Sequence, residues 1–282
     1  EMISEAFDER YISVVQGNRT VNAALLEQRW DLIFFTGSPS LGKKVMEAAS
    51  RHLTPVILEL GGKSPCIIDK SADIRIAAKR IAWGKTLNSG QTCIAPDYIL
   101  IHKEIQKEFV KAFAEEIKNL HGEDIQADRH YVRMVNDKAF ERVTGYFKDG
   151  NIIYGGRTDA ATRFIEPTLI ENVPLDSPLM TEEIFGPVFP VITLNDKGNS
   201  FADKVIDFVT SREKPLAFYY FGKESDGWEI IGRTSSGGGC INDVIMHIAN
   251  ENVPFGGVGN SGMGRYHDKD SFEAFSHTRS II

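Results

Sequence analysis

Hydrophobic and polar positions along the chain follow two alternating patterns. Short apolar runs rich in Val and Ile are typical of buried strands, and longer segments with apolar residues at helical spacing are typical of amphipathic helices. The predicted strands cover residues 11–15, 32–35, 56–60, 98–102, 151–154, 188–194, 216–221 and 239–243. The predicted helices cover residues 41–52, 71–87, 105–120, 137–147, 201–211 and 225–234. This alternation of strands and helices predicts an α/β fold with a mostly parallel sheet.

Composition and charge narrow the classes of partner. Hydrophobic residues make up 42% of the 282 residues and charged residues 25%, which is ordinary for a globular protein. No apolar run approaches the roughly 18 residues that a membrane span needs. The formal net charge of −7, without a run of Lys or Arg, argues against nucleic acid and anionic membranes. We therefore expect neither a membrane span nor a nucleic-acid partner.

The cysteine content indicates the redox environment. The chain has three cysteines, Cys66, Cys93 and Cys240, which lie far apart in the sequence. A sparse and odd number argues against a disulfide framework and favours a reducing compartment, so we expect a cytoplasmic protein. No cluster of Asp, Glu and His has the spacing of metal ligands, so no metal site is expected.

A strand, a tight turn and a helix follow one another between residues 31 and 42. Gly37 would let the backbone approach a ligand closely, and the Ser38 hydroxyl could add a hydrogen bond. A helix N-terminus offers unpaired N–H groups and the positive end of the helix dipole, where a phosphate can bind. An ordinary turn in which Ser38 caps the helix explains the same residues, so both interpretations stay open.

Glu59 interrupts an apolar strand shortly before Gly61 and Gly62. A carboxylate at this place is either paired or desolvated, and desolvation would raise its pKa to a value that suits a general base. The alternative is a solvent-facing side chain at the end of a strand, which the alternation of a strand permits. The two glycines would provide flat backbone against which a planar ligand or a domain crossing could lie.

Cys93 follows a glycine turn and precedes the predicted strand at residues 98–102. A thiol on such a loop can be activated by a lowered pKa or by a neighbouring base. Cys66 and Cys240 lie in strand-like runs and are expected to be small buried hydrophobes. Residues 257–262 match the string G-x-G-x-x-G, but they lack a clear preceding strand, and only 20 residues follow them. We therefore expect a loop that packs its backbone against another element rather than a dinucleotide-binding turn.

Taken together, these segments resemble the aldehyde dehydrogenase superfamily. The segments that carry the resemblance occur in the family's order and are Phe-Thr-Gly-Ser at 35–38, Leu-Glu-Leu-Gly-Gly-Lys at 58–63, Gly-Gln-Thr-Cys at 90–93, Glu-Glu-Ile-Phe-Gly-Pro at 182–187, Pro-Phe-Gly-Gly at 254–257 and Ser-Gly-Met-Gly at 261–264. Each motif is weak alone, but the ordered set is specific and covers essentially the whole chain. Segments similar to the class 3 and fatty-aldehyde branch in particular lie at residues 53–56, 62–66, 94–98, 242–247 and 271–277.

The resemblance implies an enzyme that oxidises an aldehyde to a carboxylic acid with NAD or NADP and that forms a homodimer. By position, Cys93 would be the nucleophile that forms a thiohemiacetal and then a thioester. Glu59 would activate the water that hydrolyses the thioester. Two alternatives stay open, namely a dehydrogenase that passes the acyl group to coenzyme A and a non-catalytic scaffold that retained the fold.

The resemblance also implies a set of cofactor-binding residues. Gly37 and Ser38 would lie at the pyrophosphate of NAD or NADP. Glu183 would accept hydrogen bonds from the nicotinamide ribose, and Phe185 would lie near the same end of the cofactor. Gly61 is also expected among the cofactor-binding residues.

The division of the chain follows from the same resemblance. Residues 1–61 would be the remnant of a Rossmann-type NAD(P)-binding domain, residues 62–238 the catalytic domain, and residues 239–282 a segment that returns to the cofactor side and forms the tail. The family's cofactor domain is expected to begin well before Glu1, so the chain resembles an aldehyde dehydrogenase that lacks its N-terminal part. We therefore expect the 282-residue chain to bind cofactor weakly and to be catalytically impaired.

Overall fold

The computed structural model describes residues 2–282, and its strands fall into two main sheets of unequal size and one short pair. The strands are β1 (Ile33–Thr36), β2 (Val56–Glu59), β3 (Pro65–Ile68), β4 (Tyr98–His102), β5 (Asn151–Tyr154), β6 (Thr158–Asp159), β7 (Phe164–Ile165), β8 (Thr168–Glu171), β9 (Val188–Leu194), β10 (Ala217–Phe221), β11 (Gly238–Ile241) and β12 (Gly262–Met263). The larger sheet has the order β11-β10-β3-β4-β9-β8-β5, and the smaller has the order β1-β2-β12. In the larger sheet every pairing is parallel except that of β5 with β8. The prediction of an α/β fold with a mostly parallel sheet is therefore confirmed.

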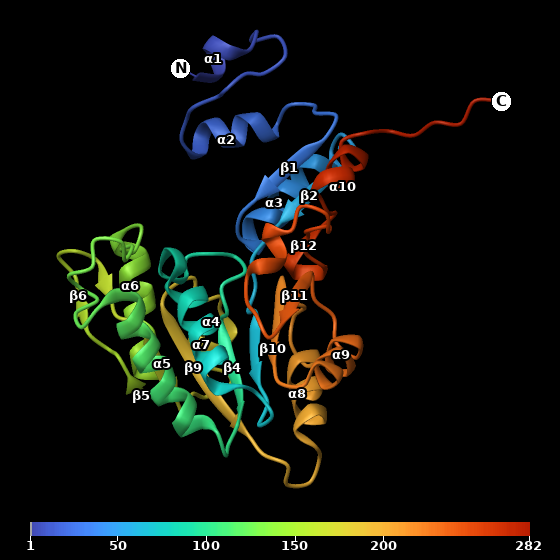
Figure 1. The fold of residues 1–282 in the computed structure, drawn as a ribbon. Helices are drawn as coiled ribbons and strands as arrows, with labels where there is room; N and C mark the ends of the chain where they lie inside the picture. Colours follow the sequence, from blue (N-terminus) through green and yellow to red (C-terminus); the bar gives the residue numbers. More distant parts are fainter. Residues whose placement is uncertain (1) are drawn as a thin grey trace.

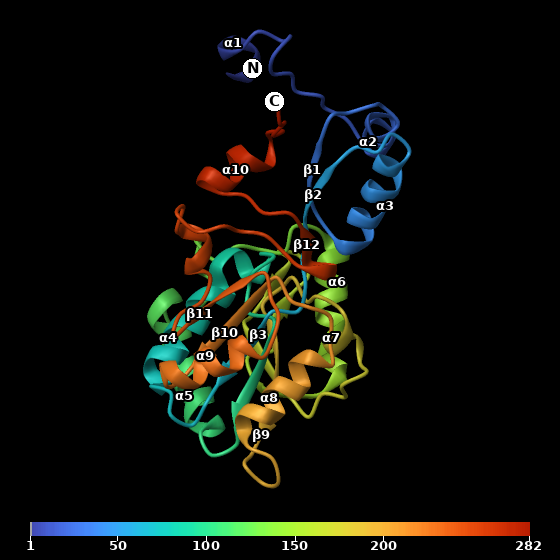
Figure 2. The ribbon, with the colours of Figure 1, turned by 90° about the vertical axis from the view of Figure 1, so that its right-hand side faces the viewer.

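Helices connect the strands in the way that parallel pairing requires. The α-helices are α1 (Met2–Ala6), α2 (Arg19–Leu26), α3 (Pro39–Ser50), α4 (Ile74–Thr86), α5 (Gln106–His121), α6 (Asp137–Gly145), α7 (Pro178–Thr181), α8 (Phe201–Thr210), α9 (Glu224–Gly232) and α10 (Asp268–Ala274). Short 3₁₀ helices lie at Leu87–Gly90, Tyr146–Asp149, Met246–Ala249 and Gly259–Ser261. Figures 1 and 2 show the small sheet with α2, α3 and α10 at one end of the molecule, and both chain termini lie at this end.

Alternate residues of the large sheet pack against helices on its two faces. In β3, Cys66 and Ile68 belong to the core that the sheet forms with α4 and α5. Ile67, between them, belongs to the core on the opposite face, which includes side chains of α6, α7, α8 and α9. Because successive side chains of a strand point to opposite faces, a strand that is buried on both faces reads as a continuous apolar run.

The small sheet has a core of its own, and a short connection joins it to the large sheet. Its buried residues are Val45, Leu58 and Leu60, to which partly buried side chains of α2, β1 and β2 add. The chain leaves the small sheet at Glu59 and enters the large sheet at Pro65. β12 later returns to the small sheet and pairs with β2 in the antiparallel direction.

Several predicted elements differ from the structure. Residues 11–15, predicted as a strand, lie outside every strand and are exposed, because none of the described strands pairs with them. The predicted strand ranges also lack β3, β6, β7, β8 and β12, although Cys66 of β3 is expected in a strand-like run. Of these, β6, β7 and β12 have two residues each and are too short to show a period. β11 pairs with β10 in the large sheet, and the chain returns to the small sheet at β12.

Among residues 2–282, the structure contains no helix with both the length and the apolar character of a membrane span.

Candidate active site

Three segments that carry candidate residues meet at one edge of the large sheet. β3, β4 and β9 are parallel neighbours, so the segments that lead into these strands emerge at the same edge. These segments are residues 60–64, 91–97 and 182–187. β2 ends at Glu59, directly before the first of them. The topology therefore brings Glu59, Cys93 and Glu183 to one place, although 124 positions (183 − 59) separate the first and the last.

A strained turn precedes Cys93. The φ angles of Asn88, Ser89 and Gly90 are 50°, 53° and 69°, in the left-handed region that favours glycine. Each non-glycine residue in such a conformation costs about 1–3 kcal/mol unless the surrounding structure holds it there. The Ser89 hydroxyl donates a hydrogen bond to the carbonyl oxygen of Val132 and fixes the turn from outside. Backbone strain of this kind is concentrated at functional sites.

Glu59 is buried at the end of β2, with 3% of its surface exposed. The Gly257 N–H donates a hydrogen bond to its carboxylate, and its Oε1 atom has no hydrogen-bond partner among the described residues. Burial raises the pKa of Glu59 to about 7. The structure therefore favours the desolvated carboxylate over the solvent-facing alternative.

Glu183 lies against the connection between the two sheets. Its carboxylate occupies the space beside Gly61, where a Cβ atom would overlap both of its oxygens. The Gly62 N–H donates a hydrogen bond to the carboxylate, whose pKa is raised to about 7 by burial and then by the charge of Asp97. Phe185 has a φ of 45° and is 40% exposed on the same segment. Gly61 thus makes room for Glu183 in this structure.

The Cys93 thiol is protonated at neutral pH in this arrangement. Burial raises its pKa to about 11, with further contributions from Glu183 and Glu59. The N–H groups of Cys93 and Ile94 hydrogen-bond the sulfur and offset this effect only in part. Of the two routes to activation, a lowered pKa is therefore wrong for this state, and a neighbouring base remains. Glu59, with a pKa of about 7, can be ionised at neutral pH and can serve as that base.

The turn at Gly37 and Ser38 lies beside Glu59. The Gly37 N–H donates to the carbonyl oxygen of Glu59 at 2.9 Å, because β1 and β2 are parallel neighbours. Ser38 caps α3 by accepting a long hydrogen bond of 3.4 Å from the Leu41 N–H. The first turn of α3 contains no acidic residue, and Lys43 follows it. The cap is therefore present, and the charges around it also suit a phosphate.

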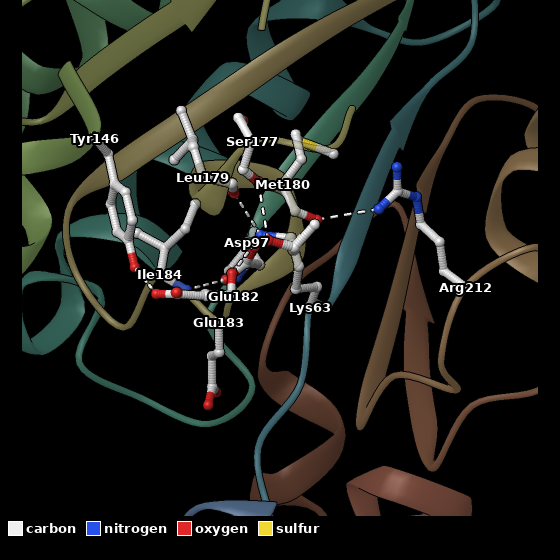
Figure 3. A network of polar contacts seen from close by, with 12 residues as sticks. Lys63, Asp97, Tyr146, Ser177, Leu179, Met180, Glu182, Glu183, Ile184 and Arg212 are labelled. Carbon is white, nitrogen blue, oxygen red and sulfur yellow. Dashed lines mark hydrogen bonds and ion pairs between the residues drawn. The ribbon is translucent and has the colours of Figure 1, made fainter. Parts of the chain in front are cut away.

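Two charged residues at this edge have no role predicted from the sequence. Lys63 and Asp97 form an ion pair in the interior, beside the backbone of residues 182–184 (Figure 3). Arg142 donates to the same backbone from α6. Their one indication in the sequence is that Lys63 and Asp97 lie within the segments that carry the family resemblance.

The remaining sequence candidates lie as follows. Cys66 is fully buried in β3, and half-buried Cys240 has its sulfur 3.5 Å from Nδ1 of His247. The glycine-rich loop at residues 257–262 packs its backbone on Glu59 and β2, as expected for a loop that approaches another element closely. The described residues contain no group of three or more His, Cys, Asp and Glu side chains that could hold a metal ion.

The fold and the site define an α/β protein with a loop cysteine, a buried carboxylate and a half-buried carboxylate at the edge of a parallel sheet. The family model described as "Aldehyde dehydrogenase family" matches residues 1–281. This chain therefore belongs to the aldehyde dehydrogenase family.

Individual relatives support this assignment. "Aldehyde dehydrogenase, dimeric NADP-preferring" of Rattus norvegicus is 48% identical over all 282 residues, which make up 61% of the relative's length. A solved structure titled "Substrate bound state of Staphylococcus Aureus AldH" has a TM-score of 0.93 and 44% identity, covering 99% of this chain and 62% of that one. The NAD-dependent aldehyde dehydrogenase of Sinorhizobium meliloti has a TM-score of 0.82 and 28% identity, covering 92% of this chain and 52% of that one. The chain thus spans about three fifths of the length of its closely similar relatives.

Proposed function

We propose that this chain provides the reactive thiol and the general base of an enzyme that oxidises an aldehyde to a carboxylic acid with NAD or NADP. The observation that carries the proposal is the convergence of Cys93, Glu59 and Glu183 at one edge of the large sheet, in a chain of the aldehyde dehydrogenase family. The names of similar proteins mention NADP preference in one case and NAD dependence in another, so either cofactor is compatible with the proposal.

In the proposed reaction, Cys93 forms the covalent bond to the substrate. The sulfur attacks the aldehyde carbon and gives a thiohemiacetal, while ionised Glu59 accepts the thiol proton. The two events occur together, because a pKa of about 11 for Cys93 and about 7 for Glu59 makes proton transfer ahead of the attack unfavourable. Removal of hydride from this adduct leaves a thioester on Cys93, and formation of this intermediate divides one difficult oxidation into two easier steps.

Glu59 acts a second time in the hydrolysis of the thioester. Glu59 first releases the thiol proton to solvent, and the ionised carboxylate then takes a proton from water, whose oxygen attacks the thioester carbon and releases the carboxylic acid. The Cys93 thiolate that leaves is then reprotonated. A base at this place favours water as the acyl acceptor, since transfer to coenzyme A does not need it. The ratio of free acid to acyl-coenzyme A product distinguishes the two.

The residues expected at the cofactor suit NAD or NADP chemically. The Ser38 hydroxyl and the start of α3, free of acidic residues, suit the pyrophosphate. The Glu183 carboxylate, which accepts from the Gly62 N–H, retains lone pairs for ribose hydroxyls. Phe185 presents an exposed ring on the same segment. When bound, the nicotinamide cofactor accepts the hydride that leaves the substrate.

We propose that residues 1–61 and the returning segment 239–282 bind the cofactor and that residues 62–238 carry the nucleophile. The homodimer is supported by the word "dimeric" in the name of the rat relative. The cytoplasmic location expected from the sparse cysteines remains a prediction.

Substitution of two cysteines tests the proposal. In the intact protein, Cys93→Ala should abolish aldehyde oxidation, whereas Cys66→Ala should preserve it, because Cys66 is fully buried in β3 and faces the core with α4 and α5. The assay follows reduction of NAD and of NADP in the purified proteins, with circular dichroism to show that both variants fold. Equal losses in the two variants would exclude Cys93 as the specific nucleophile and would favour the non-catalytic scaffold.

A further inference from the structure

The backbone around Glu183 is held by charged side chains from distant parts of the chain. Lys63 Nζ donates hydrogen bonds to the carbonyl oxygens of Leu179 and Glu182, each at 2.8 Å, and forms an ion pair with Asp97 Oδ1. The second carboxylate oxygen of Asp97 accepts from the Ile184 N–H at 2.9 Å. The pair therefore holds the residues on both sides of Glu183.

The hydrogen bonds of Lys63 exclude a direct role in ligand binding. An ammonium group has three N–H donors, and the three partners of Lys63 are Asp97, Leu179 and Glu182. The side chains of Lys63 and Asp97 are only 13% and 4% exposed. A buried charge with all of its donors used holds backbone in place and has none left for a substrate or cofactor.

The Glu183 side chain points away from this pair. Figure 3 shows Lys63 and Asp97 beside the backbone of residues 182–184, with the Glu183 side chain extended in another direction. That direction leads to Gly61 and to the Gly62 N–H, which donates to the carboxylate. Since Lys63 follows Gly62 in the same connection, one short segment fixes both the backbone and the carboxylate of Glu183.

Arg142 completes the support from the other side. Its guanidinium donates to the carbonyl oxygen of Glu183 at 3.2 Å and to that of Ile184 at 2.9 Å. The same guanidinium donates to the Tyr146 hydroxyl, which donates in turn to the Glu182 carboxylate at 2.9 Å. Each carbonyl oxygen from Glu182 to Ile184 is thus bound by a cationic side chain.

We propose that Lys63 and Asp97 are positioning residues. They fix the backbone of residues 182–184 so that the Glu183 carboxylate stays beside Gly61 and its negative charge stays close to the Cys93 thiol. The importance of this for aldehyde oxidation rests on the proposed function. The placement of the Glu183 carboxylate does not rest on the proposed function, and it can be measured without cofactor or aldehyde.

The charge environment makes Cys93 a reporter of where Glu183 lies. The groups coupled electrostatically to the Cys93 thiol are Glu59, Glu183, Tyr219 and Tyr266. Those coupled to the Glu183 carboxylate are Asp97, Lys63, Arg142, Lys85 and Cys93. Because the negative charge of Glu183 raises the pKa of Cys93, loss or displacement of that charge lowers it.

The test measures the rate at which iodoacetamide alkylates Cys93 as a function of pH, with peptide mass mapping to separate Cys93 from Cys66 and Cys240. Glu183→Gln and Lys63→Met should each shift the pH profile of alkylation to lower pH. At about pH 8, a shift of one unit raises the rate about threefold, since the gain in thiolate is partly offset by lower nucleophilicity. The double variant should show no shift beyond that of Glu183→Gln alone, because both changes act through one carboxylate.

Three further variants separate positioning from general damage. Lys63→Met combined with Asp97→Asn removes both charges together, which leaves no unpaired buried carboxylate if the single variant fails to fold. Lys63→Arg keeps the charge and should retain most of the wild-type profile. Lys70→Met is the matched control, because Lys70 pairs with Asp196 at 2.5 Å beyond the opposite end of β3, and it should leave the Cys93 profile unchanged.

The outcomes decide the proposal independently of the proposed function. The positioning role would be overturned if the pH profile of Cys93 alkylation shifted in Glu183→Gln but shifted neither in Lys63→Met nor in Lys63→Met combined with Asp97→Asn. No shift in Glu183→Gln would also overturn it, because the carboxylate would then not act on Cys93. If the wild-type protein oxidised no aldehyde while the expected profiles were found, the proposed function would fail and the positioning role would stand.

Discussion

Glu59 shows how burial can prepare a single residue for two proton transfers. The carboxylate loses water at the end of β2, retains a hydrogen bond from Gly257, and reaches a pKa of about 7. At this value the group is partly ionised at neutral pH, while its conjugate acid still releases a proton readily. The same burial leaves the Cys93 thiol with a pKa of about 11, so the thiol depends on the base.

The pH dependence of the reaction should report this carboxylate. In the wild-type protein, the rate of ester hydrolysis or aldehyde oxidation should rise with pH and level off above about pH 7, because only ionised Glu59 is a base. Glu59→Gln should lower the rate by about 100-fold or more and remove the plateau. Steady-state rates from about pH 5.5 to about pH 9 test this, and an unchanged profile in Glu59→Gln would exclude Glu59 as the base.

The free energy of unfolding should fall as pH rises, in contrast to the reaction rate, which should rise with pH. The pKa of Glu59 is raised from 4.5 to about 7 on folding, so between these values the folded protein binds a proton that the unfolded chain releases. Stability from this group is therefore lost as pH rises through that window. Glu59→Gln should gain about 1–3 kcal/mol in free energy of unfolding relative to wild type between about pH 5 and about pH 8. Urea denaturation at the two pH values measures this difference in free energy of unfolding. A loss of stability in Glu59→Gln relative to wild type on going from the lower to the higher pH would contradict a raised pKa for buried Glu59.

At the scale of elements, the loop of Cys93 and the loop of Glu183 support each other. A Cβ atom at Gly90 would come within 2.5 Å of the carbonyl oxygen of Gly186. Gly90 therefore allows a close approach between the segments that lead into β4 and β9, in addition to its positive φ of 69°. The approach couples the position of the nucleophile to that of the carboxylate.

A pair of glycine substitutions isolates this contact. Gly90→Ala should destabilise the protein by about 2–4 kcal/mol and reduce activity, because it adds both backbone strain and a collision with backbone. Gly122→Ala should cost only about 1 kcal/mol and preserve activity, since Gly122 has a φ of 81° but nothing within 4 Å of an added Cβ. Thermal melts and activity assays compare the two, and equal effects would show that the loop contact does not matter.

The sequence predicts the long elements of this fold and the nature of its candidate site, but not how the site is supported. α5 and β9 follow from periodicity because their apolar residues repeat over many positions. Residues 11–15 have the same strand-like pattern and remain exposed, because pairing depends on a neighbour that a local pattern does not reveal. Cys93 and Glu59 stand out as reactive residues in unusual places, whereas Glu183 emerges only from the family resemblance.

The interactions that support the site cannot be predicted from the sequence for a related reason. Lys63 and Asp97 are 34 positions apart, and the backbone that they hold lies a further 85 or more positions along the chain (182 − 97). Only the side-by-side order of β3, β4 and β9 brings these residues together, and a pattern of local periodicity does not determine strand order.

At the scale of the whole molecule, the candidate site joins two bodies with very different cores. The large sheet is buried on both faces by extensive apolar clusters, whereas the small sheet rests on Val45, Leu58 and Leu60. Glu59 belongs to the small sheet, and Cys93 and Glu183 belong to segments of the large one. The site therefore depends on the less strongly packed body.

Local opening should follow this division. In hydrogen exchange of the 282-residue chain, amides of β1 and β2 should exchange faster than those of β3, β4 and β10, because fewer buried apolar contacts hold them. Reactions that require Glu59 should be lost at lower urea concentration than the near-ultraviolet signal of the large core. Uniform exchange in both sheets would show that the two bodies open as one cooperative unit.

The central claim is that Cys93 carries the acyl group and that Glu59 releases it. The most direct measurement is mass mapping of the protein after brief reaction with an activated acetate ester, which acylates the nucleophile without cofactor. Because loss of Glu59 slows acylation as well as hydrolysis, the reaction is run at a pH high enough to ionise part of the Cys93 thiol without a base. There one acetyl group should accumulate on the Cys93 peptide of Glu59→Gln, while in the wild-type protein it should turn over and leave little adduct. Accumulation on Cys66 or Cys240, or equal adduct on Cys93 in both proteins, would contradict the account.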